Sequence, residues 1–293
     1  MTKESQDIWS RWMLERRFGG NKDAMQTALT KYLYPWRDKI LDHANLQKGE
    51  ILLDVGCGDG LIAFGALEKE KTSRVIFSDI SQDLLDHAQS IAQEMNVLNR
   101  CQFMNASADD LSEIQDGSVD VVTTRSVLIY VSAKQRAVQE FYRVLKSGGR
   151  LSIFEPISRF SDPEPSHIFA GYNVQPVVGI AKKLKDHYEH IQPSNTDPMG
   201  DFDERDLVSF AENVGFNEIH LELNIEIKPI PEKITWEQFL HYAANPKVPT
   251  LEEAMQEVLS SEEIDTFSLQ LRPLVEQGQG IRRGAFAYLW AVK

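Results

Sequence analysis

An α/β fold built around a mostly parallel, doubly wound sheet is the architecture that this sequence predicts. Short apolar runs of strand length alternate with amphipathic segments of helical length from residue 51 to residue 154. A glycine-rich turn follows the first of these runs, as at the ligand-binding edge of such sheets. The 293 residues, 42% of them hydrophobic, suffice for one elaborated domain or two small ones. Alternating strands and helices imply right-handed crossovers, which pair the strands in parallel.

Seven segments are expected to form the strands of this sheet. They are residues 51–55, 74–79, 102–105, 119–124, 151–154, 218–227 and 285–292. Four segments are expected to form flanking helices, namely residues 61–69, 82–96, 133–145 and 203–214. Ser81 is a suitable N-cap for the second helix, because its hydroxyl can accept a free backbone N–H. The β-forming residues of 285–292 suit a strand at the edge or in the centre of the sheet.

Three further segments interrupt this alternation and are expected to form a helical lid and cap. We place an N-terminal helical lid at 1–45, the sheet core at 46–157, a cap insertion at 158–200, a continuation of the core at 201–230, a helical insertion at 231–283 and the last core strand at 284–293. The lid should contain two helices separated by residues 18–21, with Gly19 and Gly20 as a hinge. The proline-rich stretch from Pro156 to Gly200 is expected to be irregular.

Composition and charge narrow the class of protein. The formal net charge is −13, and lysines and arginines are scattered, so a nucleic-acid partner is not expected. No apolar run reaches the roughly 20 residues that span a bilayer, so no membrane partner is expected either. The charged N-terminus lacks the pattern of a signal peptide, and Cys57 and Cys101 are the only cysteines. We therefore expect a cytoplasmic protein without a disulfide framework.

The turn DVGCGDG, residues 54–60, is the expected ligand site. Glycines permit a tight turn and a close approach of a ligand to the backbone. The spacing differs from the dinucleotide fingerprint Gly-x-Gly-x-x-Gly, and no Gly-Lys-Ser/Thr follows that would form a P-loop. Asp54 and Asp59 would repel a pyrophosphate but attract a cationic ligand. The alternative is a tight turn that binds nothing.

Asp79, at the end of the second expected strand, is the next candidate. It lies about twenty residues beyond the glycine loop, where an acidic side chain reaches ribose hydroxyls in related sheets. The alternative is that Asp79 only caps the following helix, although Ser81 already suits that role.

Four motifs in order make residues 46–155 resemble the class I methyltransferases that depend on S-adenosylmethionine (SAM), specifically the group that methylates small molecules. DVGCGDG, FSDIS, DGSVDVVTTRSVLIYV and VLKSGGRLSIFEP resemble the family's successive motifs. The resemblance implies a Rossmann-like fold, SAM as cofactor and S-adenosylhomocysteine as product. It also implies a cofactor site formed by Asp54, Gly56, Cys57, Gly58, Asp59, Gly60, Asp79, Ile80, Ser107, Ala108, Asp109, Arg125 and Ser126. Within it, the glycines line the methionine end, Asp79 holds the ribose and Ile80 packs on the adenine.

One position departs from the family pattern. Ser107 stands where the family usually has an acidic residue that accepts from the adenine amino group, and Asp109 can substitute for it. We expect direct in-line transfer of a methyl group to a small organic acceptor, without a metal. The sequence identifies neither a catalytic residue nor the oligomeric state. A protein or RNA methyltransferase, a nicotinamide enzyme and a non-catalytic SAM-binding module remain alternatives.

Overall fold

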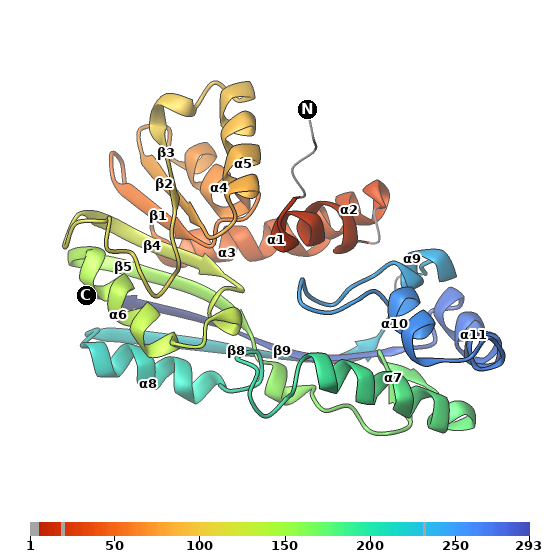
Figure 1. Ribbon diagram of the computed structural model, residues 1–293. Helices are drawn as coiled ribbons and strands as arrows, with labels where there is room; N and C mark the ends of the chain where they lie inside the picture. The colour runs from red at the N-terminus through yellow and green to blue at the C-terminus, as the bar shows by residue number, and fades with distance from the viewer. Residues whose placement is uncertain (1–5, 19–20, 231–232) are drawn as a thin grey trace. The chain divides into compact units, whose positions relative to one another are not determined.

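The structure, a computed structural model, describes residues 6–18, 21–230 and 233–293, and its main feature is one large sheet (Figure 1). In these residues the sheet has seven strands in the order β3-β2-β1-β4-β5-β9-β8. The strands are β1 (Ile51–Val55), β2 (Arg74–Asp79), β3 (Cys101–Asn105), β4 (Val119–Arg125), β5 (Leu145–Pro156), β8 (Glu218–Pro229) and β9 (Ile281–Val292). The predicted seven-stranded sheet is confirmed, and β9 lies inside the sheet while β8 forms its edge.

The order of the strands reverses between β1 and β4. The pairs β1–β2, β2–β3, β1–β4 and β4–β5 are parallel, and β5–β9 is antiparallel. From β1 the chain steps outward in one direction to β2 and β3, and then returns to build outward from β4 in the other. Crossovers of one hand therefore place the helices that follow β1 and β2 on one face, and the helix that follows β4 on the other. The carboxyl ends of β1 and β4 meet at this switch point, with Val55 opposite Thr124.

Helices cover both faces of the sheet. Those associated with it are α3 (Tyr34–Ala44), α4 (Leu61–Lys69), α5 (Gln82–Glu94), α6 (Lys134–Val144) and α8 (Glu204–Val214). Contacts join α3 to α4, and α6 to α8. One apolar core joins α3, α4 and α5 to the sheet, with Ile40, Leu52 and Phe77 fully buried. Ser81 accepts from the backbone N–H of Leu84 at 3.1 Å, so the predicted N-cap of α5 is confirmed.

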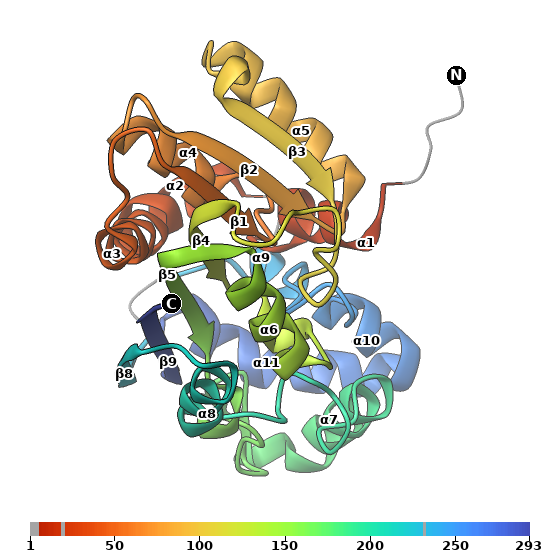
Figure 2. The same ribbon diagram turned by 90° about the vertical axis from the view of Figure 1, so that its left-hand side faces the viewer.

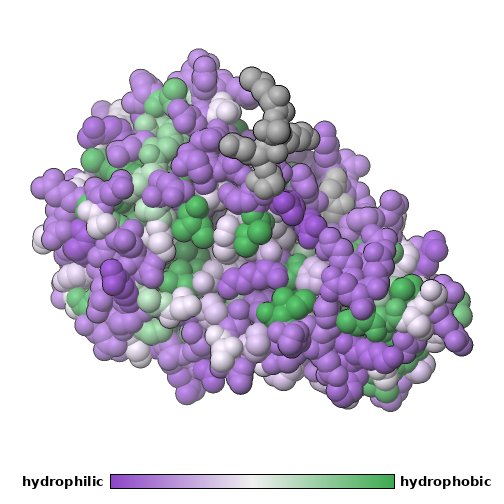
Figure 3. Space-filling view, viewed as in Figure 1, coloured by the Kyte–Doolittle hydropathy of each residue, from purple (hydrophilic) through white to green (hydrophobic). Residues whose placement is uncertain are grey.

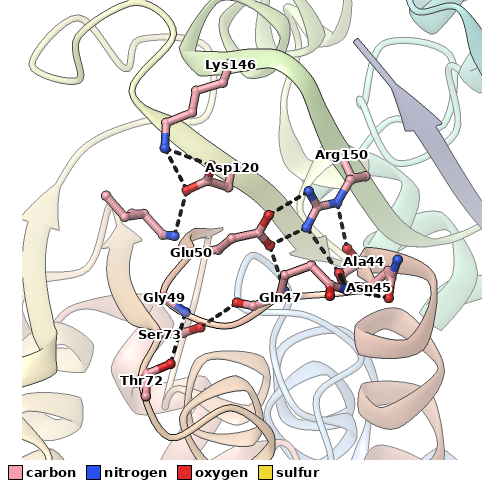
Figure 4. Close-up of polar contacts among 11 residues, drawn as sticks. Ala44, Asn45, Gln47, Gly49, Glu50, Thr72, Ser73, Asp120, Lys146 and Arg150 are labelled. Carbon is pink, nitrogen blue, oxygen red and sulfur yellow. Dashed lines mark hydrogen bonds and ion pairs between the residues drawn. The ribbon is translucent and has the colours of Figure 1, made fainter.

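A polar network joins the amino-terminal ends of the parallel strands, whereas the glycine loop lies at their carboxyl-terminal ends (Figure 4). The Arg150 guanidinium binds both oxygens of Glu50 and donates to the backbone carbonyls of Ala44 and Asn45 at 3.2 and 3.1 Å. Nearby, Lys146 pairs with Asp120 at 2.7 Å. The network thus joins the end of α3 to the start of β1, and β4 to β5.

The chain divides into two compact units. One comprises residues 27–157, 202–224 and 286–293, and the other comprises the described residues of 1–26, 158–201 and 225–285. The second unit is mainly helical and has its own apolar cluster around Phe267, Leu271 and Val275. Its elements are α1 (Ile8–Arg11), β6 (Ile168–Phe169), β7 (Tyr172–Asn173), α7 (Val178–Ile191), α9 (Trp236–Leu240), α10 (Leu251–Val258) and α11 (Ser261–Glu276). The remaining α-helix among the described residues, α2 (Lys22–Ala28), has residues in both units.

The expectation that residues 156–200 are irregular is wrong over α7. All prolines of this stretch lie outside the helix, and within it Ala181 and Leu184 are completely buried. Proline content therefore described the flanking loops, whereas the buried positions at helical spacing describe the segment between them. The two N-terminal helical runs are present on either side of residues 18–21, but the predicted hinge at Gly19 and Gly20 lies outside the described residues.

The outer surface is polar on the face that Figure 3 shows, where hydrophobic residues form small, separate groups. Within the part of the chain that the structure describes, every helix is too short or too polar to cross a membrane.

Candidate functional site

The loop after β1 has a backbone that only glycines adopt easily. Gly56, Gly58 and Gly60 have φ angles of +63°, +55° and +89°. A Cβ atom on Gly56 would lie 2.4 Å from Cγ2 of Val127, and one on Gly60 would lie 2.5 Å from the Phe64 ring. Both the backbone conformation and the space therefore require glycine at these two positions. The loop ends at α4, whose first turn presents backbone N–H groups.

Asp54 is the buried anchor of this loop. Its side chain accepts from the Thr123 hydroxyl at 2.9 Å and from the backbone N–H of Ala63 at 3.1 Å. Burial raises the pKa of Asp54 to about 7, against the opposing effect of these two hydrogen bonds. The carboxylate thereby ties β1 to its neighbour β4 and to the first turn of α4. That Asp54 also touches a ligand stays a prediction.

Asp79 brings the second predicted motif against the first. Its Oδ2 accepts from the backbone N–H of Gly58 at 2.8 Å, and its Oδ1 accepts from that of Ser81 at 2.9 Å. The Asp79 carbonyl also accepts from Ala106 at 3.0 Å, at the end of β3. Each oxygen of a carboxylate can accept more than one hydrogen bond, so a ribose hydroxyl remains compatible with these contacts. Asp79 therefore connects the loops after β1, β2 and β3, whereas the side chain that caps α5 is that of Ser81.

The residues predicted to face the adenine lie on the loops after β2 and β3. The Ile80 side chain is 52% exposed, although it is apolar and follows a buried strand. An exposed apolar side chain beside a buried carboxylate suits stacking on a flat ring. On the next loop Ala108 is buried, and the Ser107 hydroxyl donates to the Asp109 carboxylate. The serine that departs from the family pattern is thus paired directly with the acidic residue expected to replace the missing one.

The last predicted residues, Arg125 and Ser126, end β4. Ser126 has a φ of +58° and donates its backbone N–H to the Phe154 carbonyl at 2.8 Å. Arg125 is half-buried, and its charge acts to lower the pKa of Asp54 on the neighbouring strand β1. The predicted residues therefore gather at the carboxyl ends of β1, β2, β3 and β4.

Glu155, at the end of β5, is a site residue that the sequence interpretation missed. It is completely buried, and its carboxylate accepts from the backbone N–H groups of Val127, Leu128 and Ile129 at 2.9, 2.9 and 3.1 Å. Burial raises the pKa of Glu155 to about 7, and these amides act in the opposite direction. Glu155 thus fixes the backbone directly after the β4 motif. The available signal was an acidic residue ending the apolar run LSIF, where a charge needs partners.

The loop is acidic, and its thiol is inert. Burial, followed by the charges of Asp79, Asp54 and Asp59, raises the pKa of the Cys57 thiol well above its usual range. Both Cys57 and Cys101 are free thiols. A buried, protonated thiol is a poor nucleophile, so Cys57 fills space beneath the loop. Three carboxylates around one thiol also make this region attractive to a cation.

No side chain emerges as a general base from these contacts. Of the histidines in the helical unit, His187 and His241 have Nε2 atoms that lie 3.0 and 3.4 Å from carboxylate oxygens of Glu257 and Glu252. Tyr172, also in that unit, is buried in its apolar cluster. In the described ranges, histidine, cysteine and acidic side chains form no group that could hold a metal ion.

Comparison with known proteins finds a matching family model and relatives of similar sequence. The model of the ubiE/COQ5 methyltransferase family matches residues 20–224, which is more than half of the chain. The chain is 29% identical over 169 residues to a ubiquinone/menaquinone biosynthesis C-methyltransferase UbiE from Psychromonas ingrahamii, a match that covers 54% of this chain and 64% of that protein. It is 28% identical over 190 residues to the protein of the same name from Haemophilus ducreyi, covering 63% and 71%.

Solved structures share the fold at low sequence identity. The YcgJ protein from Bacillus subtilis superposes with a TM-score of 0.56 at 20% identity, covering 89% of this chain and 98% of that one. Phosphoethanolamine N-methyltransferase 2 from Haemonchus contortus, solved with S-adenosylhomocysteine, superposes with a TM-score of 0.53 at 16% identity, covering 98% and 56%. These likenesses confirm the predicted fold class.

Proposed function

Because the chain belongs to the ubiE/COQ5 methyltransferase family, we propose that it transfers a methyl group from SAM to a small organic acceptor. Membership confirms the class predicted from the sequence, a class I SAM-dependent methyltransferase. The match spans less than two thirds of the Psychromonas relative, so the reaction and the acceptor of this chain are proposals. The names of both relatives favour carbon as the atom that accepts the methyl group.

The contact between Asp79 and Gly58 is the observation that carries this proposal. At 2.8 Å it holds an acidic side chain against a loop of left-handed glycines, so that one ligand can meet both. SAM fits the groups present there. Its ribose offers two hydroxyls to the Asp79 carboxylate, and its sulfonium and ammonium are cationic, which suits a loop that carries the half-buried Asp59.

The proposed chemistry needs positioning more than acid–base groups. When bound, SAM supplies an electrophilic methyl group. The chain's own residues hold the reactants in line, and such positioning supplies much of the rate of a bimolecular displacement. Asp54 and Glu155 contribute by fixing the β1 loop and residues 127–129, through 3.1 Å and 2.9–3.1 Å hydrogen bonds respectively. A base is needed only for an acceptor that is protonated at the working pH.

The helical unit is the proposed source of acceptor specificity. The family model ends at residue 224, so α9, α10 and α11 lie beyond the span that this chain shares with its family. Segments outside a shared core are where related enzymes differ in what they bind. Deletion of residues 1–30 should leave much of the SAM affinity and remove turnover. Equal loss of binding and turnover would count against a separate role in recognising the acceptor.

Two measurements test the proposed function. Titration calorimetry should detect binding of SAM and S-adenosylhomocysteine and none of NAD. Label from [methyl-³H]SAM should then pass to a filtrate of small metabolites and to neither protein nor RNA from the same cells. Label in the macromolecular fractions would favour a protein or RNA methyltransferase instead. Binding without transfer to any fraction would favour a non-catalytic SAM-binding module.

A further inference from the structure

The loop between β3 and β4 carries residues expected to face the adenine. It spans residues 106–118, and none of the described helices and strands lies within it. The loop leaves the end of β3 and runs down beside α6, in the same compact unit (Figure 2). Buried backbone groups of such a loop need hydrogen-bond partners outside it, because they belong to no helix or strand ladder. Side chains of α6 supply several of these partners.

Glu140 and Arg143 hold both backbone polar groups of one loop residue. The Glu140 carboxylate accepts from the backbone N–H of Leu111 at 2.9 Å, and the Arg143 guanidinium donates to the Leu111 carbonyl at 2.9 Å. The two side chains also bind each other through hydrogen bonds of 2.9 and 2.7 Å. Arg143 reaches further, to the carbonyl of Ile114 at 2.8 Å and the carboxylate of Asp116 at 2.6 Å. The Leu111 side chain is completely buried, so this residue is fixed at its backbone and at its side chain.

Arg136 holds the same loop from the preceding turn of α6. Its Nε donates to the Asp109 carbonyl at 2.8 Å. Residues three and four positions apart share a face of a helix, so Arg136, Glu140 and Arg143 form one row, here called the α6 stripe. On the same loop, the Ser107 hydroxyl donates to Oδ1 of Asp109. The Asp109 backbone is thus held by the α6 stripe, and its side chain is held by Ser107.

Asp109, rather than its neighbour Asp110, is the acidic group that suits a ligand at this loop. Asp110 is exposed, and its carboxylate accepts from the backbone N–H of Ser112 at 3.3 Å. Asp109 is half-buried and follows the buried Ala108. A charged acceptor that is partly shielded from water forms a stronger hydrogen bond than an exposed one. The α6 stripe therefore holds the more effective of the two acceptors.

We propose that the α6 stripe positions Asp109 to accept a hydrogen bond from the amino group of the SAM adenine. This inference rests on the proposed function, because it requires SAM at the carboxyl ends of the strands. Each oxygen of a carboxylate can accept more than one hydrogen bond, so the contact with Ser107 is compatible with the amino group. A loop that is already fixed loses less conformational entropy when the ligand binds. Arg136, Glu140 and Arg143 thus act through the loop, as positioning residues.

The preference for an adenine amino group tests this positioning. Titration calorimetry on the full chain compares S-adenosylhomocysteine with its deamino analogue, in which hydrogen replaces the amino group. Wild type should bind S-adenosylhomocysteine about tenfold or more tighter, because the analogue has no donor for the Asp109 carboxylate. Arg136→Ala should reduce this preference by about threefold or more, through weaker binding of S-adenosylhomocysteine alone. Glu140→Ala should act in the same direction, whereas Arg136→Lys, which keeps a donor, should recover part of the preference.

Two control variants separate positioning from a general effect of charge. Arg205→Ala removes an arginine whose side chain is 88% exposed on α8, and Asp110→Asn removes the charge beside Asp109. Both should keep the wild-type preference, and circular dichroism should show that all variants are folded. An Arg136→Ala variant that keeps the full preference, or that weakens both ligands equally, overturns the positioning role. Wild type that binds both ligands equally overturns the contact with Asp109, and wild type that binds neither ligand contradicts the proposed function itself.

Discussion

Replacing Asp79 by alanine should weaken SAM binding far more than it disturbs the fold. In the structure the Asp79 oxygens already accept from Gly58 and Ser81 at 2.8 and 2.9 Å, and they are the groups proposed to hold the ribose hydroxyls. A hydrogen bond to a charged group contributes about 1.5–3 kcal/mol. Loss of the ribose contact should therefore raise the dissociation constant of SAM roughly 10- to 150-fold.

The same change should also cost some stability. Asp79 is 7% exposed, so its removal leaves two backbone N–H groups without their charged acceptor in a nearly dry environment. We expect the free energy of unfolding to fall by about 1–3 kcal/mol. Asp79→Asn should lie between wild type and alanine in SAM affinity, because an amide keeps one acceptor oxygen and loses the charge.

Titration calorimetry at one salt concentration measures the affinity, and denaturant unfolding measures the stability. Asp86→Ala is the matched control, because it removes an exposed carboxylate from the helix that follows Asp79. It should leave the SAM affinity unchanged. If folded Asp79→Ala bound SAM as tightly as wild type does, the ribose assignment would be wrong. The only role of this carboxylate would then be to accept hydrogen bonds from the backbone N–H groups of Gly58 and Ser81.

Three further substitutions test the glycine loop at Gly58, the polar network around Arg150 and the buried carboxylate of Asp54. Gly58→Val should abolish SAM binding in titration calorimetry. The control is Gly117→Val, because Gly117 has a similarly left-handed backbone (φ +60°) but lies in open space, and this variant should still bind SAM. If both variants lost SAM binding equally, backbone strain alone would explain the effect. Arg150→Gln should lower the free energy of unfolding by about 2–4 kcal/mol, because it breaks the partly buried pair with Glu50. Arg272→Gln, which breaks an exposed pair with Glu276, should lower it by less than about 0.5 kcal/mol. Similar losses for the two variants in denaturant unfolding would contradict this prediction. Because burial raises the pKa of Asp54 to about 7, its contribution to stability is fully present below pH 4 and is lost as the pH rises to 7. The stability of wild type relative to Asp54→Asn should fall by about 4 kcal/mol across that range, and a flat or rising difference would refute the shift.

Local patterns in the sequence were enough for most of the sheet. The runs that became β1, β2 and β4 are short, apolar and followed by polar turns, so their identity does not depend on distant residues. The same holds for the Ser81 cap, which involves residues only three positions apart. Residues 178–191 were misjudged because prolines in the flanking loops dominated the interpretation of the whole stretch, whereas the helix is recognised by Ala181 and Leu184.

For the candidate site, the sequence by itself determined the glycine loop and the acidic residue at Asp79, because a left-handed turn and a strand-end carboxylate are local properties. Only the tertiary structure showed that Glu155 holds residues 127–129, more than twenty positions away, and that Asp54 is tied to Thr123. It also decided that β9 is inside the sheet and β8 at its edge. Strand order and the partners of buried charges depend on which distant segments meet in the folded chain, and hydrophobic periodicity carries no information about that.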